Sequence, residues 1–198
     1  MSIMFGALRL GLKAWDKGEQ DTDIMHRVRI VKTLMKRQIA SINTTRLLNA
    51  ELHPKPMAFI LKGTQNSMEF ISNYSILPDT KIIPVYARYF VNTNKGTDDL
   101  VMEEHEISTL NEKSLRNIAK TYEEDSLHVL LKNVHDFSFE YLKKNIEGYN
   151  SWYNSWNMDL DKSVDFPIAV KISFVVDKIQ FSLIAKIMSD SEKIKGVK

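Results

Sequence analysis

Residues 24–42 read IMHRVRIVKTLMKRQIASI, and this segment is the strongest guide to the architecture. Its apolar residues recur at spacings of three and four, which is typical of one face of an α-helix. The residues on this face are Ile24, Val28, Val31, Met35, Ile39 and Ile42. From Ile24 to Arg46 the chain has six basic residues and no acidic residue, so we expect a helix with a basic outer surface.

The residues upstream continue the same pattern. Met4, Leu8, Leu12 and Trp15 follow the helical spacing, and no proline occurs before Pro54. We therefore expect a single long N-terminal helix, with residues 1–23 forming its first half. A dozen residues this rich in apolar side chains suggest the cut edge of a longer protein, next to a hydrophobic segment. The longest apolar stretch here is far shorter than the roughly 20 residues of a membrane-spanning helix.

After Pro54 the apolar pattern changes to a period of two, which predicts strands. Turn-forming residues between these segments predict hairpins at 63–66, 92–97 and 177–178. The fold class we expect is α+β, with a long N-terminal helix packed on antiparallel sheet. The predicted strands are Met57–Leu61, Ser67–Ser75, Ile82–Val91, Asp98–Ile107, Val134–Leu142, Ile168–Val176 and Ile179–Ile187.

Composition is that of an ordinary globular domain. The 198 residues are 43% hydrophobic and 26% charged, and the net charge of +2 does not by itself indicate nucleic-acid binding. The absence of cysteine excludes disulfides and thiolate metal sites. We expect a globular domain over residues 24–188 and a mobile charged tail over 189–198.

Motifs for catalysis are missing. The sequence has no G-x-S-x-G, P-loop, G-x-G-x-x-G or H-E-x-x-H motif, so we expect no enzyme activity and no cofactor. Glu103-Glu104-His105-Glu106 places a histidine among acids, but on a strand Glu104 and Glu106 face away from His105, which disfavours a metal site. Asp159, Asp161 and Asp165 resemble the start of a calcium loop that lacks its glycine and its final glutamate, so calcium remains a weak alternative.

Two surface features have competing interpretations. The basic helix could contact phosphates of nucleic acid, yet attraction to a membrane surface suits it better beside such an apolar start. Trp152 and Trp156 lie in the densest aromatic cluster and could form a surface aromatic patch. A role in covering the edge of the core is the favoured interpretation of that cluster.

Four segments, taken in order, resemble the J-type minor pseudopilins of the type II (general) secretion pathway, within the type IV pilin-like superfamily. Residues 12–39 are similar to the long helix of the family, including a late Gln38. Residues 63–72 resemble its glycine turn and apolar-x-Phe-x-Ser strand, and residues 129–142 resemble its Leu-Leu-x-x-Val…Phe-x-Tyr segment. Trp152, Trp156 and residues 166–172 resemble its Trp…Leu-Pro-x-Ala-Val sequence, with Phe166 in place of the leucine.

The resemblance implies assembly without catalysis. It implies a periplasmic domain of a protein anchored in the inner membrane of a Gram-negative-type bacterium, through a segment that this sequence lacks. It also implies that I-type and K-type minor pseudopilins are its partners in a pseudopilus tip complex that acts in protein secretion. Val28, Val31, Met35 and Ile24 would then pack on the protein's own sheet. The residues expected to bind neighbouring helices are Met4, Leu8, Leu12 and Trp15.

Two alternatives remain open. A minor pilin of a type IV pilus or a competence system would share the helix and differ in its neighbouring genes. A periplasmic ligand-binding module belongs to a different class, and would use Trp152 and Trp156 as a binding platform.

Overall fold

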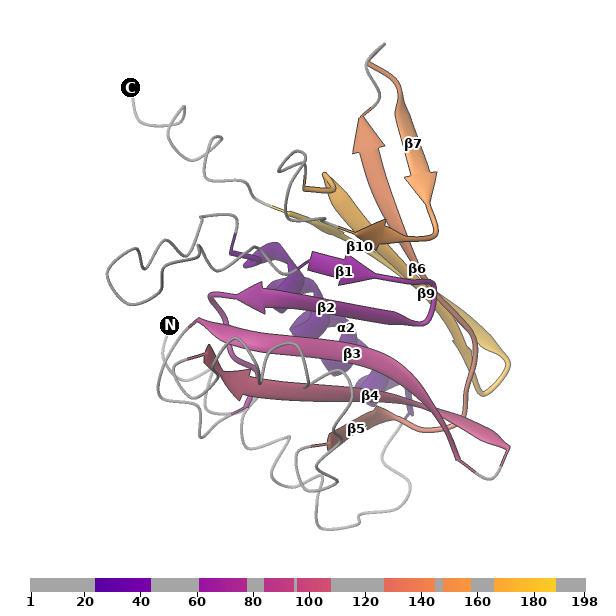
Figure 1. Ribbon diagram of the computed structural model, residues 1–198. Coiled ribbons are helices and arrows are strands. Elements are labelled where there is room, and N and C mark those ends of the chain that lie inside the picture. Colours follow the sequence, from indigo (N-terminus) through magenta and orange to yellow (C-terminus); the bar gives the residue numbers. More distant parts are fainter. Residues whose placement is uncertain are drawn as a thin grey trace.

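A computed structural model describes residues 24–43, 61–77, 84–94, 96–107, 127–144, 148–157 and 166–187 (Figure 1). These residues form two antiparallel sheets and one helix, α2 (Ile24–Ala40). The predicted fold class was wrong, because α2 has only 17 residues and strands make up most of the described chain. The prediction extended the helix through residues 1–23, which lie outside the described residues, and it missed three of the strands.

The larger sheet, sheet A, has six strands in the order β5-β4-β3-β2-β1-β8. Its central strands are long, alternate in side-chain direction and are joined by hairpins, so that neighbours in sequence are neighbours in space. The strands of sheet A are β1 (Leu61–Gly63), β2 (Ser67–Ser72), β3 (Val85–Asn94), β4 (Thr97–Glu106), β5 (Leu127–Leu131) and β8 (Trp156–Asn157).

The smaller sheet, sheet B, has four strands in the order β10-β9-β6-β7. The strands β9 and β10 pair along their whole length, from Ala169↔Lys186 to Val176↔Ile179. The strands of sheet B are β6 (Val134–Lys144), β7 (Asn150–Tyr153), β9 (Ala169–Val176) and β10 (Ile179–Lys186).

The three predicted hairpins are confirmed. Residues 64–66 join β1 to β2, and the turn between β3 and β4 contains Gly96 at φ +84°. Asp177 and Lys178 both have positive φ, which is the backbone conformation of a type I′ turn. The strands β5, β7 and β8 were not predicted as strands. The aspartates at 159, 161 and 165 lie outside the described residues.

Helix α2 contributes to the main core. It passes behind sheet A and packs against β10 of sheet B and against β5 (Figure 1). Val31, Met35 and Ile39 are fully buried among side chains from both sheets, so the apolar stripe of the helix is covered on two sides. After the helix ends, the backbone of Ile42 forms a bridge with Ser72, which ties the helix terminus to β2. No helix in the described part of the chain is long and apolar enough to cross a membrane.

Candidate functional site

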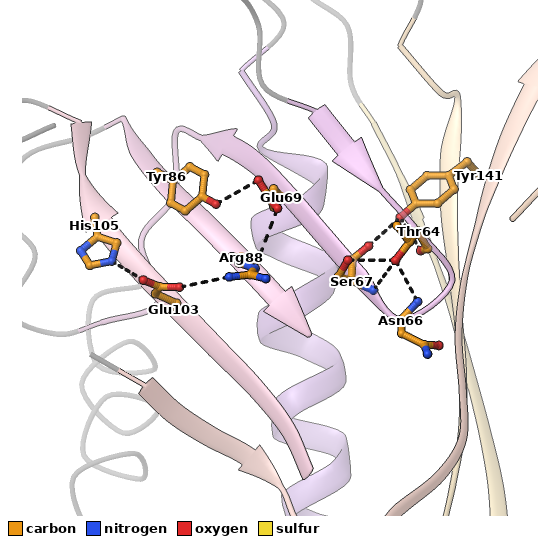
Figure 2. Close-up of polar contacts among 9 residues, drawn as sticks. All are labelled: Thr64, Asn66, Ser67, Glu69, Tyr86, Arg88, Glu103, His105 and Tyr141. Atoms are coloured by element: carbon orange, nitrogen blue, oxygen red, sulfur yellow. Dashed lines mark hydrogen bonds and ion pairs between the residues drawn. The ribbon is translucent and has the colours of Figure 1, made fainter. Parts of the chain in front are cut away.

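A row of charged side chains crosses three strands on one face of sheet A. Glu69, Arg88 and Glu103 are cross-strand neighbours on β2, β3 and β4, because the register aligns them directly. Arg88 lies 3.9 Å from Glu69 and 4.0 Å from Glu103, and His105 Nε2 lies 2.7 Å from Glu103 Oε1 (Figure 2). Such pairs stabilise neighbouring strands.

Burial of this row favours a structural role. Arg88 is 8% exposed and Glu103 is 1% exposed, although both lie on the face of sheet A opposite to α2. The Tyr86 hydroxyl donates a hydrogen bond to Glu69, and burial raises the pKa of Tyr86 well above its ordinary value. Glu69 and Glu103 therefore share one cation, the Arg88 guanidinium. Among the described residues, no group of three or more His, Asp or Glu side chains could hold a metal ion.

Glu104 faces the other side of β4 from His105, as the alternation of a strand requires. This carboxylate lies inside the molecule and accepts hydrogen bonds from Gln38 Nε2 at 2.7 Å and from the backbone N–H of Ile76 at 3.0 Å. Ser75 also donates a hydrogen bond to it. The buried Tyr89 hydroxyl donates to Gln38 Oε1. Gln38, Ser75, Tyr89 and Glu104 form what we call the helix lock, which joins α2 to β3 and β4.

The sequence contained a signal for the helix lock that our prediction did not use. Gln38 stands three residues after Met35 on the apolar face, where a polar side chain needs a buried partner. The sequence does not say which residue is that partner, and Glu104 was considered only as a metal ligand.

A second site of close contact joins the two sheets at the turn between β1 and β2. The Tyr141 hydroxyl of β6 donates to the carbonyl oxygen of Thr64 at 3.2 Å, and Thr64 Oγ1 accepts from the backbone N–H of Asn66 and of Ser67 (Figure 2). A Cβ atom at Gly63 would lie 1.8 Å from the Tyr141 hydroxyl oxygen. Glycine is therefore required at position 63 by the approach of Tyr141.

The segments that carry the resemblance meet in space. The Ser72 hydroxyl of β2 donates to the backbone oxygen of Gln38 at 2.9 Å, and the Phe70 ring stacks on Tyr89. Tyr141 covers Gly63 from the other sheet. Three of the four segments, far apart in the sequence, thus supply contacts that join α2, sheet A and sheet B.

Only some of the residues expected to pack on the protein's own sheet are buried. Val28, Val31 and Met35 are buried in the core, whereas Ile24 is 36% exposed. Met25, next to it, is 45% exposed, so the first turn of α2 presents apolar side chains at the surface. The residues expected to bind partner helices, Met4, Leu8, Leu12 and Trp15, lie outside the described residues.

Trp152 and Trp156 do not form one patch. Trp152 pairs with Leu142, and its ring lies 5.9 Å from Lys171 Nζ, on the outer face of sheet B. Trp156 belongs to β8 of sheet A, and its ring lies 6.3 Å from the ring of Tyr141, which points to the inner face. The two indoles therefore lie on opposite sides of β6, and the predicted platform is not assembled from them.

No protein-family model matches the sequence, and a search of curated proteins found no match.

Proposed function

We propose that the protein is a minor pseudopilin, a structural subunit of the pseudopilus tip of a type II secretion system. It acts in protein secretion by assembling with I-type and K-type minor pseudopilins, and it carries no catalytic site of its own. We place it in the periplasm of a Gram-negative-type bacterium, held at the inner membrane.

One observation carries this proposal. Residues from three of the segments that resemble the family contact one another, since the Ser72 hydroxyl donates to the backbone oxygen of Gln38 and Tyr141 covers Gly63. Each segment alone is degenerate, but chance similarity would not be expected to select residues that contact one another. The proposal rests on these contacts and does not depend on the fold class predicted from the sequence.

The exposed start of α2 suits a role in assembly. Ile24 and Met25 present apolar surface in the first turn, while the last turns of the helix are held by Gln38. An amphipathic helix with a rigidly held C-terminal half can offer its N-terminal half to neighbouring helices. The exposed Arg29 and Lys36 lie on the polar side of the helix, away from the buried apolar stripe.

Co-purification with partner proteins tests this proposal. The chain would be co-expressed with the I-type and K-type proteins encoded beside its gene, and the complex isolated through a tag on one partner. We expect a complex with the unaltered chain, and at least tenfold less complex with Ile24→Asn/Met25→Asn, because both substitutions remove exposed apolar surface. Circular dichroism would check that the variant keeps its fold.

The matched control is Ile179→Asn/Ile184→Asn, which removes two exposed apolar side chains from β10. This control should leave the complex intact. If the unaltered chain forms no complex, or if both variants bind equally well, the proposal fails. Neighbouring genes for a type IV pilus or a competence system would assign the chain to that class of filament instead.

A further inference from the structure

The strand β10 forms one edge of sheet B, and among the described strands it pairs with β9 alone. It has eight residues, whereas the other edge strands of the two sheets, β5, β7 and β8, have five, four and two. Proteins usually protect a long edge with proline, a bulge or charged side chains, because its backbone groups can pair with another chain. β10 contains no proline, its register with β9 is unbroken, and its only charged residue is Lys186 at the last position.

The hairpin turn fixes which backbone groups of β10 point outward. A two-residue turn is closed by hydrogen bonding between the residues that flank it, here Val176 and Ile179, so the odd-numbered residues of β10 bond to β9. The hydrogen bond from the backbone N–H of Ile187 to the carbonyl oxygen of Ile168 follows the same alternation. The N–H and C=O groups that point away from β9 therefore belong to the even-numbered residues, which are Gln180, Ser182, Ile184 and Lys186.

These even-numbered residues are exposed, and Ile184 is 50% exposed. Helix α2 lies against the other face of β10, where Leu183 and Ala185 belong to the main core. On that face Lys32 Nζ of the helix lies 5.9 Å from the ring centroid of Phe181. The helix therefore covers one face of β10, and the residues that carry the outward backbone groups remain accessible.

We propose that β10 pairs with β10 of a second copy of this chain, antiparallel and around a two-fold axis at Leu183, so that the two copies of sheet B become one continuous sheet. In this register Gln180 lies opposite Lys186 of the second copy, and Ser182 lies opposite Ile184. Every outward N–H and C=O group of β10 then has a partner. The two exposed Ile184 side chains become diagonal neighbours and cover each other.

Charge and register select a second copy as the occupant of this edge. Lys186 meets the neutral amide of Gln180, so no like charges lie directly opposite each other. A shift of the two-fold axis to Ser182 would place Lys186 opposite Lys178, and a shift to Ile184 would place Gln180 beyond the end of the opposite strand. The edge is thus complementary to itself in one register, as a two-fold interface requires. The inference does not rest on the proposed secretion role.

Sedimentation of the full 198-residue chain at increasing concentration tests the inference. We expect the monomer mass at the lowest concentration and the dimer mass at the highest. Ile184→Lys should weaken dimerisation about tenfold or more, because it places two ammonium groups at diagonal positions between the paired strands. The matched control is Val129→Lys on the edge strand β5, where Val129 is 40% exposed, and it should leave dimerisation unchanged. Circular dichroism would check that both variants keep their fold.

Cysteine cross-linking tests the register and does not depend on how the lysine variants fold. The chain contains no cysteine, so each introduced thiol is the only one in its chain. Ser182→Cys and Ile184→Cys chains, mixed and mildly oxidised, should form a mixed disulfide several times faster than either chain cross-links with itself, because these two positions lie opposite each other. Val129→Cys is the control and should not cross-link.

Three results would overturn the inference. The first is a chain that stays monomeric at every concentration, including the case in which Ile184→Lys lowers only the binding of a different protein. The second is equal dimerisation of the two lysine variants, which would place the interface elsewhere. The third is cross-linking of Ser182→Cys mainly with itself, or cross-linking of Val129→Cys, which would show another register or another edge.

Discussion

At the scale of single residues, the contact between Gly63 and Tyr141 places the strictest limit on side-chain size. No side chain fits at position 63, because the Tyr141 hydroxyl occupies the place of a Cβ atom. The same hydroxyl donates to the carbonyl oxygen of Thr64, so the tyrosine both fills the space and satisfies a backbone acceptor. One glycine therefore permits sheet B to dock on the turn of sheet A.

We expect Gly63→Ala to lower the free energy of unfolding by about 2 kcal/mol or more, because the methyl group overlaps Tyr141 and forces the sheets apart. Urea unfolding measures this change. Gly96→Ala is the comparison, since Gly96 has φ +84° but nothing within 4 Å of its Cβ position. That substitution should cost about 1 kcal/mol through backbone strain alone.

A double-mutant cycle separates overlap with Tyr141 from other effects. In a Tyr141→Leu background the added cost of Gly63→Ala should shrink, because the group that it meets is gone. An unchanged cost in that background would show that the backbone of the turn, and not Tyr141, requires glycine.

At the scale of elements, the most important contacts are those that attach α2 to the two sheets. Apolar contacts are not directional, so burial alone would let a short helix shift along the sheets that it packs against. The helix lock prevents this, because Gln38 donates both to Glu104 and to the backbone oxygen of Tyr74 at 3.1 Å, and accepts from Tyr89. Buried polar groups of this kind carry a large penalty when one partner is removed.

We expect Gln38→Met to destabilise the fold by about 3 kcal/mol, because it leaves buried Glu104 and Tyr89 without their shared partner. Gln180→Met on β10 is the control, since Gln180 is exposed, and it should change stability by less than about 0.5 kcal/mol. Replacing Glu104 by Met together with Gln38 should recover part of the loss. Urea midpoints that are equal for the Gln38 variant and the control would contradict the helix lock.

Buried tyrosines from both sheets couple the stability of the whole molecule to alkaline pH. Burial raises the pKa of Tyr86, Tyr89 and Tyr141 above the ordinary value of 10.0. Above pH 10 the unfolded chain releases these protons, while the folded protein retains them. The unfolded state then binds fewer protons than the folded state, so stability falls as pH rises.

We expect the free energy of unfolding to be insensitive to these tyrosines below pH 10 and to fall above it, by up to about 1.4 kcal/mol per pH unit for each buried tyrosine. Urea unfolding between pH 9 and pH 11 measures the slope. Tyr141→Phe should reduce the slope, whereas Tyr149→Phe, at a ring that is 69% exposed, should leave it unchanged. A slope that is identical in both variants would contradict this assignment.

Several elements could be predicted from the sequence because their signals are local. The hairpins at Gly96 and at Asp177-Lys178 were recognised from turn residues between segments of period two. The strand β5 was missed because Leu127–Leu131 is a short, mostly apolar run without clear alternation. Two weak strands, β7 and β8, lie among aromatic and polar residues whose pattern does not distinguish a strand from a loop.

The sequence by itself determined which residues share a face: the buried stripe of α2, and the separation of Glu104 from Glu103 and His105 across β4. These follow from backbone geometry, which repeats every 3.6 residues in a helix and every two in a strand. Only the tertiary structure decided which faces meet. Gln38 and Glu104 are 66 residues apart, and Tyr141 and Thr64 are 77 apart. Such partners are set by how helix and sheets pack together, and no local periodicity contains that information.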